Sequence, residues 1–146
     1  MSCQSCAISS ARNQLAGKIS QLTPGAVNTE VILDLGGGSS VAAIITNESA
    51  KSLNLAVGQE ACALFKASWV IVTLDKGLKT SARNQYAGKV KEVKTGAVNS
   101  EVILELPGGQ TLVAIITNES ATHLGLKPGV EASALIKASH IIIGVK

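Results

Sequence analysis

The sequence predicts an all-β protein with one short helix per repeat, built from two tandem five-stranded barrels. Three observations support this fold class. A shift of 71 residues aligns residues 10–75 with 81–146 without a gap, and 38 of the 66 aligned positions are identical. Within each repeat, apolar residues mostly alternate with polar ones, which is the period of a half-buried strand. Aromatic residues make up only 2% of the chain, so any core must consist of Val, Ile, Leu and Ala.

In the first repeat, the first predicted strand covers residues 15–22 (LAGKISQL). The second covers residues 26–35, and its alternation predicts a buried face that holds Val27, Val31, Leu33 and Leu35. Glycines 36–38 form a turn before a third strand over residues 40–45. The segment 107–109 (PGG) is the corresponding turn in the second repeat.

A short helix is predicted over residues 47–55, because Ala50, Leu53 and Leu55 recur at helical spacing. Thr46 and Asn47 are the candidates for its N-cap, and the helix ends before Gly58. Residues 60–66 and 69–73 are the last two strands. Three strands, a helix and two strands in so short a unit fit a small barrel of the OB type. Because such a unit buries little surface for its size, it favours oligomerisation.

The repeat sets the predicted domain boundaries. Residues 1–7 form an N-terminal tail, residues 8–75 the first OB-like domain, residues 76–80 a short linker and residues 81–146 the second OB-like domain. The net charge of +3 is too small to indicate a nucleic-acid surface. No run of eighteen apolar residues indicates a membrane span, and the N-terminus lacks the features of a secretory signal. The cytoplasm is therefore the expected compartment.

Cysteines and histidines do not form a recognisable reactive site in the sequence. Cys3 and Cys6 make a CxxC pair, but no second pair or nearby His completes a zinc set. Cys62 aligns with a serine in the second repeat, so it is interpreted as a small strand residue. Neither His123 nor His140 is conserved between the repeats. With no nucleophile, acid–base pair or metal set, the sequence does not indicate an enzyme.

A set of hydrogen-bond donors is repeated instead. The only two arginines, Arg12 and Arg83, occupy the same place in the two SARNQ segments, and a guanidinium group suits oxyanions. Each repeat also has a lysine at the end of a strand, in a KAS segment, and hydroxyl groups at the start of the short helix, where backbone N–H groups favour an anion. Each of these residues alone is typical of a helix cap or a solvated charge. Together they predict a site for a tetrahedral oxyanion.

The motifs SARNQ, GAVNxEV, a Gly-Gly turn, ITNESA and KAS followed by an apolar strand occur in order in both repeats. They resemble the molbindin, or Mop, family of molybdate-binding domains over about residues 8–146. This resemblance implies an OB-like fold, a cytoplasmic location and binding of molybdate and tungstate for molybdenum storage and homeostasis. It also implies a homotrimer, with sites between domains of different subunits. The protein would bind the anion through the anion's oxygens, no side chain would coordinate the metal directly, and no cofactor is expected.

The resemblance carries ligand positions over to both repeats. In the first they are Ser10, Ala11, Arg12 and Asn13 from one domain, with Thr46, Ser49, Ala50, Lys66, Ala67 and Ser68 of a partner. In the second they are Ser81, Ala82, Arg83 and Asn84, with Thr117, Ser120, Ala121, Lys137, Ala138 and Ser139. A second class of site is expected around Gly25, Ala26, Val27 and Asn28, and around Gly96, Ala97, Val98 and Asn99.

Two other functions remain open at this level. The chain resembles the molybdate-sensing module of regulators and transporter ATPases, although it shows no helix-turn-helix or Walker motif. A nucleic-acid-binding OB module is the other alternative. It would stack bases on aromatic side chains, and Phe65, Trp69 and Tyr86 are the only aromatic residues, none of them repeated.

Overall fold

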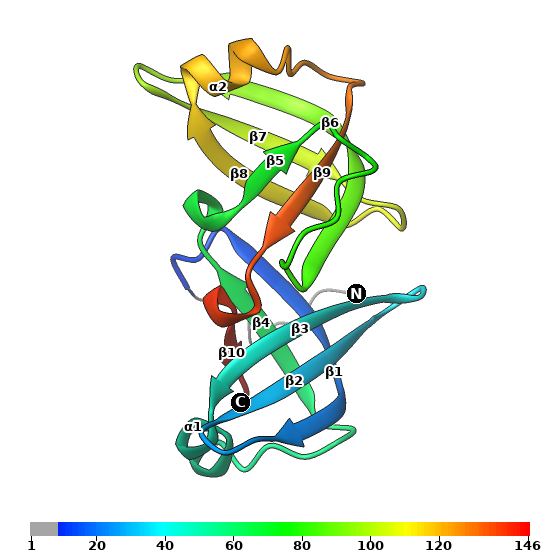
Figure 1. Cartoon of the computed structure of the whole chain (residues 1–146), viewed down its shortest axis with the longest axis vertical. Coiled ribbons are helices and arrows are strands. Elements are labelled where there is room, and N and C mark those ends of the chain that lie inside the picture. Colours follow the sequence, from blue (N-terminus) through cyan, green and yellow to red (C-terminus); the bar gives the residue numbers. More distant parts are fainter. Residues whose placement is uncertain (1–8) are drawn as a thin grey trace. The chain divides into compact units, whose positions relative to one another are not determined.

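The computed structural model describes residues 9–146 and places them in two compact units. Of the described residues, the first unit contains 9–65 together with Lys137–Lys146, and the second contains Lys66–Ile136. Each unit contains one five-stranded antiparallel sheet and one short α-helix (Figure 1). The predicted fold class is therefore confirmed. The predicted tail, with Cys3 and Cys6, lies outside the described residues.

In the first unit the strand order is β10-β4-β1-β2-β3. The strands are β1 (Asn13–Pro24), β2 (Asn28–Gly36), β3 (Ser39–Thr46), β4 (Glu60–Phe65) and β10 (Ile142–Gly144). Helix α1 (Asn47–Ser52) connects β3 to β4, and the 3₁₀ turn η3 (Ala138–His140) precedes β10. Strand β10 also contacts β3, so the first and last strands of the order meet and the sheet curls into a small barrel.

The second unit repeats this arrangement, with the strand order β5-β9-β6-β7-β8. Its strands are β5 (Ile71–Thr73), β6 (Asn84–Thr95), β7 (Asn99–Glu105), β8 (Thr111–Thr117) and β9 (Glu131–Ile136). Helix α2 (Asn118–His123) connects β8 to β9, and the 3₁₀ turn η2 (Ala67–Trp69) precedes β5. Strand β5 contacts β8 and closes this sheet in the same way.

The last strand of each repeat belongs to the unit of the other repeat. Ile142 of β10 pairs with Leu64 of β4, and Ile71 of β5 pairs with Leu135 of β9. Figure 1 shows β10 beside β4 and β5 beside β9. The compact units thus differ from the predicted domains 8–75 and 81–146 at this strand. The sequence did not indicate the exchange, because the exchanged strands have equivalent partners in the two repeats.

The alternation predicted the core of β2 in part, since Leu35 at the end of the predicted face is only half-buried. Val31 and Leu33 are buried as expected, but Val27 is 70% exposed and Thr29 is buried instead. The reason is that β2 begins only at Asn28. Val27 lies before the strand, in a bend closed by a hydrogen bond from the Gly25 amide to the Asn28 carbonyl oxygen. The apolar alternation in the sequence includes Val27, although the backbone is not yet extended at this residue.

Helix α1 begins where predicted and ends early. Thr46 is its N-cap, as one of the two alternatives proposed, since its side chain accepts a hydrogen bond from the Ser49 amide. The helix ends at Ser52, and Asn54 adopts a φ of 52°, a left-handed conformation that asparagine tolerates. Leu55, predicted to be helical, therefore lies beyond the helix. The predicted strand 69–73 is likewise shortened to Ile71–Thr73 by the preceding 3₁₀ turn.

Gly88 allows β6 and β7 to approach closely. A Cβ atom at this position would lie 2.5 Å from the carbonyl oxygen of Glu105, a separation that real Cβ atoms do not adopt. Because the obstacle is backbone, we expect Gly88→Ala to lower the free energy of unfolding by about 1–3 kcal/mol. Gly77→Ala is the matched control, since its nearest neighbour would be 3.7 Å away. Denaturant unfolding of both variants measures the difference, and equal stabilities would contradict the interpretation.

Candidate functional site

The KAS segments form the two 3₁₀ turns and have the same pattern of exposure. Lys66 and Lys137 are exposed, the alanines that follow are buried, and Ser68 and Ser139 are exposed. The buried alanine anchors each turn, while the lysine and serine side chains are left toward solvent. In the first unit η3 lies against β3, and in the second unit η2 lies against β8. These two strands lead directly into the helix caps Thr46 and Thr117.

Each helix start presents a pair of bonded hydroxyl groups. The Thr46 hydroxyl accepts a hydrogen bond from the Ser49 amide at 3.1 Å and donates one to the Ser49 hydroxyl at 2.8 Å. Thr117 and Ser120 repeat this arrangement, at 3.1 Å and 2.9 Å. The hydroxyl pair is therefore preorganised by the cap. The carboxylates of Glu48 and Glu119 in the first turns are exposed.

The exchange of strands redistributes the predicted donors. In the sequence, Thr46 and Lys66 belong to the first repeat, and Thr117 and Lys137 belong to the second. In the structure the first unit combines Thr46 with Lys137, and the second combines Thr117 with Lys66. The physical reason is that each KAS segment directly precedes an exchanged strand, so the segment moves to the other unit with that strand.

The SARN segments lead into the first strand of each repeat. Arg12 and Arg83 are exposed, whereas Asn13 and Asn84 are each only 2% exposed. The Asn84 side-chain amide donates a hydrogen bond to the Ile136 carbonyl oxygen at 3.3 Å, and its oxygen accepts one from the Tyr86 hydroxyl at 3.3 Å. Burial raises the pKa of Tyr86, so this hydroxyl stays protonated and remains a donor. The side chain of Asn84, predicted as a ligand, is thus used inside the unit.

The GAVN segments are fixed to the helix starts by an asparagine that the sequence indicated only as an alternative N-cap, and not as a site residue. The Asn47 amide donates to the Val27 carbonyl oxygen at 2.9 Å, and its side-chain NH₂ donates to the Gly25 carbonyl oxygen at 2.9 Å. Its side-chain oxygen accepts a hydrogen bond from the buried Thr29 hydroxyl at 2.5 Å. Asn118 makes the same three bonds in the second unit. The signal was available, because this asparagine lies in the duplicated ITNESA motif.

This fixation holds the GAVN bend beside the helix start in each unit. The GAVN bend lies beside the helix start, so Val27 and the Thr46–Ser49 hydroxyl pair belong to neighbouring segments. Val27 and its counterpart Val98 are both 70% exposed. Two exposed valines at the same place in both repeats provide apolar surface next to the donors.

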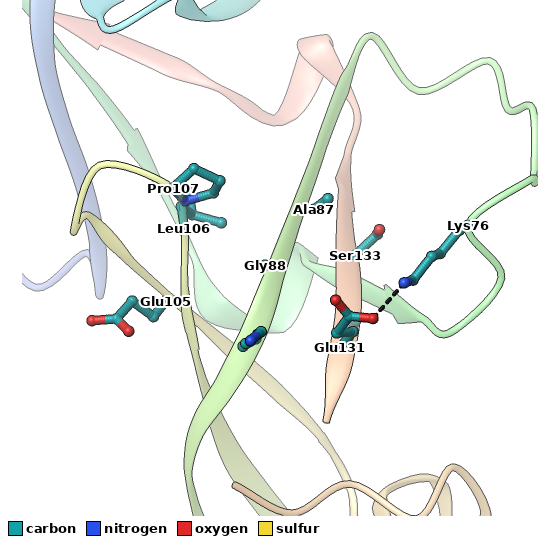
Figure 2. A pocket seen from close by; sticks show the side chains of 10 residues that line it. Lys76, Ala87, Gly88, Glu105, Leu106, Pro107, Glu131 and Ser133 are labelled. Carbon is teal, nitrogen blue, oxygen red and sulfur yellow. Dashed lines mark hydrogen bonds and ion pairs between the residues drawn. The ribbon is translucent and has the colours of Figure 1, made fainter. Parts of the chain in front are cut away.

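A hollow of the second unit lies away from the predicted ligands. It is a pocket of about 400 Å³ lined by residues of β6, β9 and the β7–β8 turn, together with Lys76 (Figure 2). None of the predicted oxyanion ligands lines it. The Lys76 ammonium pairs with the Glu131 carboxylate, and the hydrogen bond and positive charge of Lys76 lower the pKa of Glu131. With Lys89 and Glu105 also present, the pocket carries balanced charge and does not suit a dianion.

A hollow of about 580 Å³ in the first unit adjoins helix α1. It is lined by Leu22, Pro24, Thr29, Asn47, Ala50, Lys51, Asn54 and Leu55. Of the predicted ligand positions, only Ala50 lines it. Across residues 9–146, no three His, Cys, Asp or Glu side chains gather in a way that would hold a metal ion. In the same range, no helix combines the length and apolar character needed to cross a membrane.

The fold and the paired donor sets define a tandem two-barrel protein with two equivalent groups of exposed cations and hydroxyls. Comparison with known families agrees with this class. The model of the TOBE domain matches residues 9–72 and again residues 80–143. The chain belongs to the TOBE-domain family.

Its relatives have names related to molybdenum. It is 45% identical over 136 residues to the molybdenum transport protein ModE of Azotobacter vinelandii, covering 93% of this chain and 50% of ModE. It is 46% identical over 136 residues to the molybdenum-pterin-binding protein MopA of Rhodobacter capsulatus, covering 92% and 51% of the two chains. The chain thus spans about half the length of these curated relatives. The Mop resemblance is confirmed.

Among solved structures, it resembles ModG, described as a cytoplasmic molybdate-binding protein and crystallised with molybdate bound. The two sequences are 51% identical, the TM-score is 0.91, and the match covers 95% of this chain and 99% of ModG. The likeness therefore extends over both repeats.

Proposed function

We propose that this protein binds molybdate, and also tungstate, as dianions, in the cytoplasm, and serves molybdenum storage and homeostasis. The observation that carries the proposal is the pairing, in each unit, of an exposed KAS lysine with the strand that leads into a capped hydroxyl pair. Molybdate presents oxygens on its outside, and charged and neutral donors of this kind suit them. The likeness to ModG over both repeats supports the choice of anion.

We further propose that each site is completed between subunits of a homotrimer. On one chain the arginine, lysine and serine donors are exposed, so an anion bound by them alone would remain largely in water. Charge-assisted hydrogen bonds gain strength when water is excluded. Val27, Val98, Ile71 and Ile142 are between 54% and 70% exposed, and an interface that covered them would shield the donors as well.

The proposed ligand set keeps the positions named from the sequence, with the KAS segments reassigned to the units in which they lie. The first unit supplies Thr46, Ser49 and Ala50 with Lys137, Ala138 and Ser139. The second supplies Thr117, Ser120 and Ala121 with Lys66, Ala67 and Ser68. The SARN segment of a neighbouring subunit completes each set, and the GAVN bends supply a second class of site.

Native mass spectrometry with and without molybdate tests the proposal directly. We expect a trimer whose mass increases by bound molybdate ions in multiples of three. Sulfate is the matched control, because it is also a tetrahedral dianion but is smaller, and we expect weaker uptake. A trimer that takes up no molybdate would contradict the function, and a monomer that binds it fully would contradict the inter-subunit sites.

A second candidate function is the molybdate-sensing module of a longer regulator. It is favoured by the match to half of ModE. The same anion sites would then serve to sense molybdate instead of storing it. The intact mass of the protein in its native cells decides between the two, because a storage protein of this sequence alone has a mass of 14.9 kDa. A substantially larger species that contains this sequence would favour the sensing role.

A further inference from the structure

The ammonium group of Lys66 lies against an aromatic ring. Its Nζ is 5.8 Å from the centroid of the Trp69 ring, within the range of a cation–π interaction. Both residues belong to the second unit, and the 3₁₀ turn brings them together, since the Trp69 amide donates to the Lys66 carbonyl oxygen at 3.0 Å. The lysine that we assign to the anion is therefore held by its own turn.

The other KAS segment has the same backbone and a different ring. The His140 amide donates to the Lys137 carbonyl oxygen at 3.0 Å, and the φ and ψ of Lys137 (−68° and 137°) are close to those of Lys66 (−78° and 143°). Trp69 is thus replaced by His140 on an equivalent scaffold. Within residues 9–146, Lys66 is the lysine that has a cation–π partner.

We propose that Trp69 is a positioning residue, which makes the sites that contain Lys66 bind oxyanions more tightly than the sites that contain Lys137. This inference rests on the proposed function. A solvated lysine loses much rotamer freedom when it binds a ligand. The Trp69 ring already restricts Lys66 before the anion arrives. The ring attracts the charge of the ammonium group and leaves N–H groups available to donate to the anion.

The size of the effect follows from the exposure of this contact. Cation–π contacts at exposed positions correspond to about a two- to fivefold change in an equilibrium constant. Tryptophan provides the strongest aromatic face for a cation, and phenylalanine provides a weaker one. The two sets of sites should therefore fill at molybdate concentrations that differ by about two- to fivefold.

The test isolates the Lys66 sites in a Lys137→Ala background. In calorimetric titration with molybdate, we expect Trp69→Leu to weaken binding about two- to fivefold, and Trp69→Phe to retain part of the wild-type affinity. Thermal unfolding and native mass confirm that each variant keeps its fold and assembly. If Leu and Phe both leave the affinity unchanged, or both reduce it equally, the positioning role is overturned.

The Lys66→Ala background provides the matched control, because only the Lys137 sites remain. There, we expect Trp69→Leu to have no effect and His140→Trp to increase affinity about two- to fivefold. An equal loss from Trp69→Leu in both backgrounds would show a general structural effect and overturn the inference. No molybdate binding by the unmutated protein would instead overturn the proposed function, so the two failures are distinguishable.

Discussion

Replacing both Lys66 and Lys137 with alanine is expected to weaken molybdate binding at all KAS sites by about ten- to a hundredfold. Each lysine offers a charge-assisted hydrogen bond to a dianion, and such bonds contribute about 1.5–3 kcal/mol. Each single variant should affect only the sites built with its own lysine. Calorimetric titration measures affinity and stoichiometry for all three variants.

The assembly should survive these changes, because both lysines are exposed and contribute nothing to the core. Lys91→Ala is a suitable control: this exposed lysine lies on β6 and has a serine as its counterpart in the first repeat. The Lys91→Ala substitution also removes one positive charge, at a position far from both KAS segments in the sequence. Wild-type affinity and stoichiometry in the double variant would show that the anion binds elsewhere.

Ile143→Ala is expected to destabilise β4 of the first repeat, although Ile143 belongs to the second. Its side chain is buried, and its backbone pairs with Ala63 of β4. Loss of a buried isoleucine side chain lowers stability by about 2–5 kcal/mol. Native-state hydrogen exchange should therefore show the largest loss of protection in β4, with less change in β9.

Val72→Ala is the matched variant, since Val72 is the counterpart of Ile143 and pairs with Ala134 of β9. Its loss of protection should appear in β9, while β4 changes less. If Ile143→Ala instead exposed β9 and Val72→Ala exposed β4, each repeat would form its own barrel in solution and the exchange would be wrong.

The sequence was sufficient to predict the strands and helices, but it was insufficient to predict the exchange of the last strands, and the reason is physical. Alternation identifies which residues face a core, and in β2 it correctly assigned Val31 and Leu33. It does not identify which copy of an equivalent partner a strand selects. Ile71 pairs with Leu135 in the structure. The equivalent residue in its own repeat is Leu64, which is also a leucine and pairs with Ile142. Hydrophobic pattern and register are therefore the same for both pairings.

The candidate site was predictable as a set of segments and less so residue by residue. Duplication selected the SARN, ITNESA and KAS segments, and in the structure Lys66 and Lys137 of the KAS segments are exposed. It could not separate donors available to a ligand from donors used within the fold. Asn84 is buried and bonded to its own unit, while Asn47 organises the neighbouring GAVN bend. Both are polar and duplicated, and only their three-dimensional surroundings distinguish them.

The exchanged final strand also has a consequence for synthesis on the ribosome. Phe65 ends β4, but the strand that covers β4 begins at Ile142, so residues 66–141 must be translated before the first barrel can close. At typical rates of about 5–20 residues per second, this delay lasts about 4–15 s. During that time the outer edge of β4 is unpaired, and a nascent chain on a neighbouring ribosome can supply a strand to it. Until β10 is translated, this unpaired edge is therefore exposed to pairing with other chains.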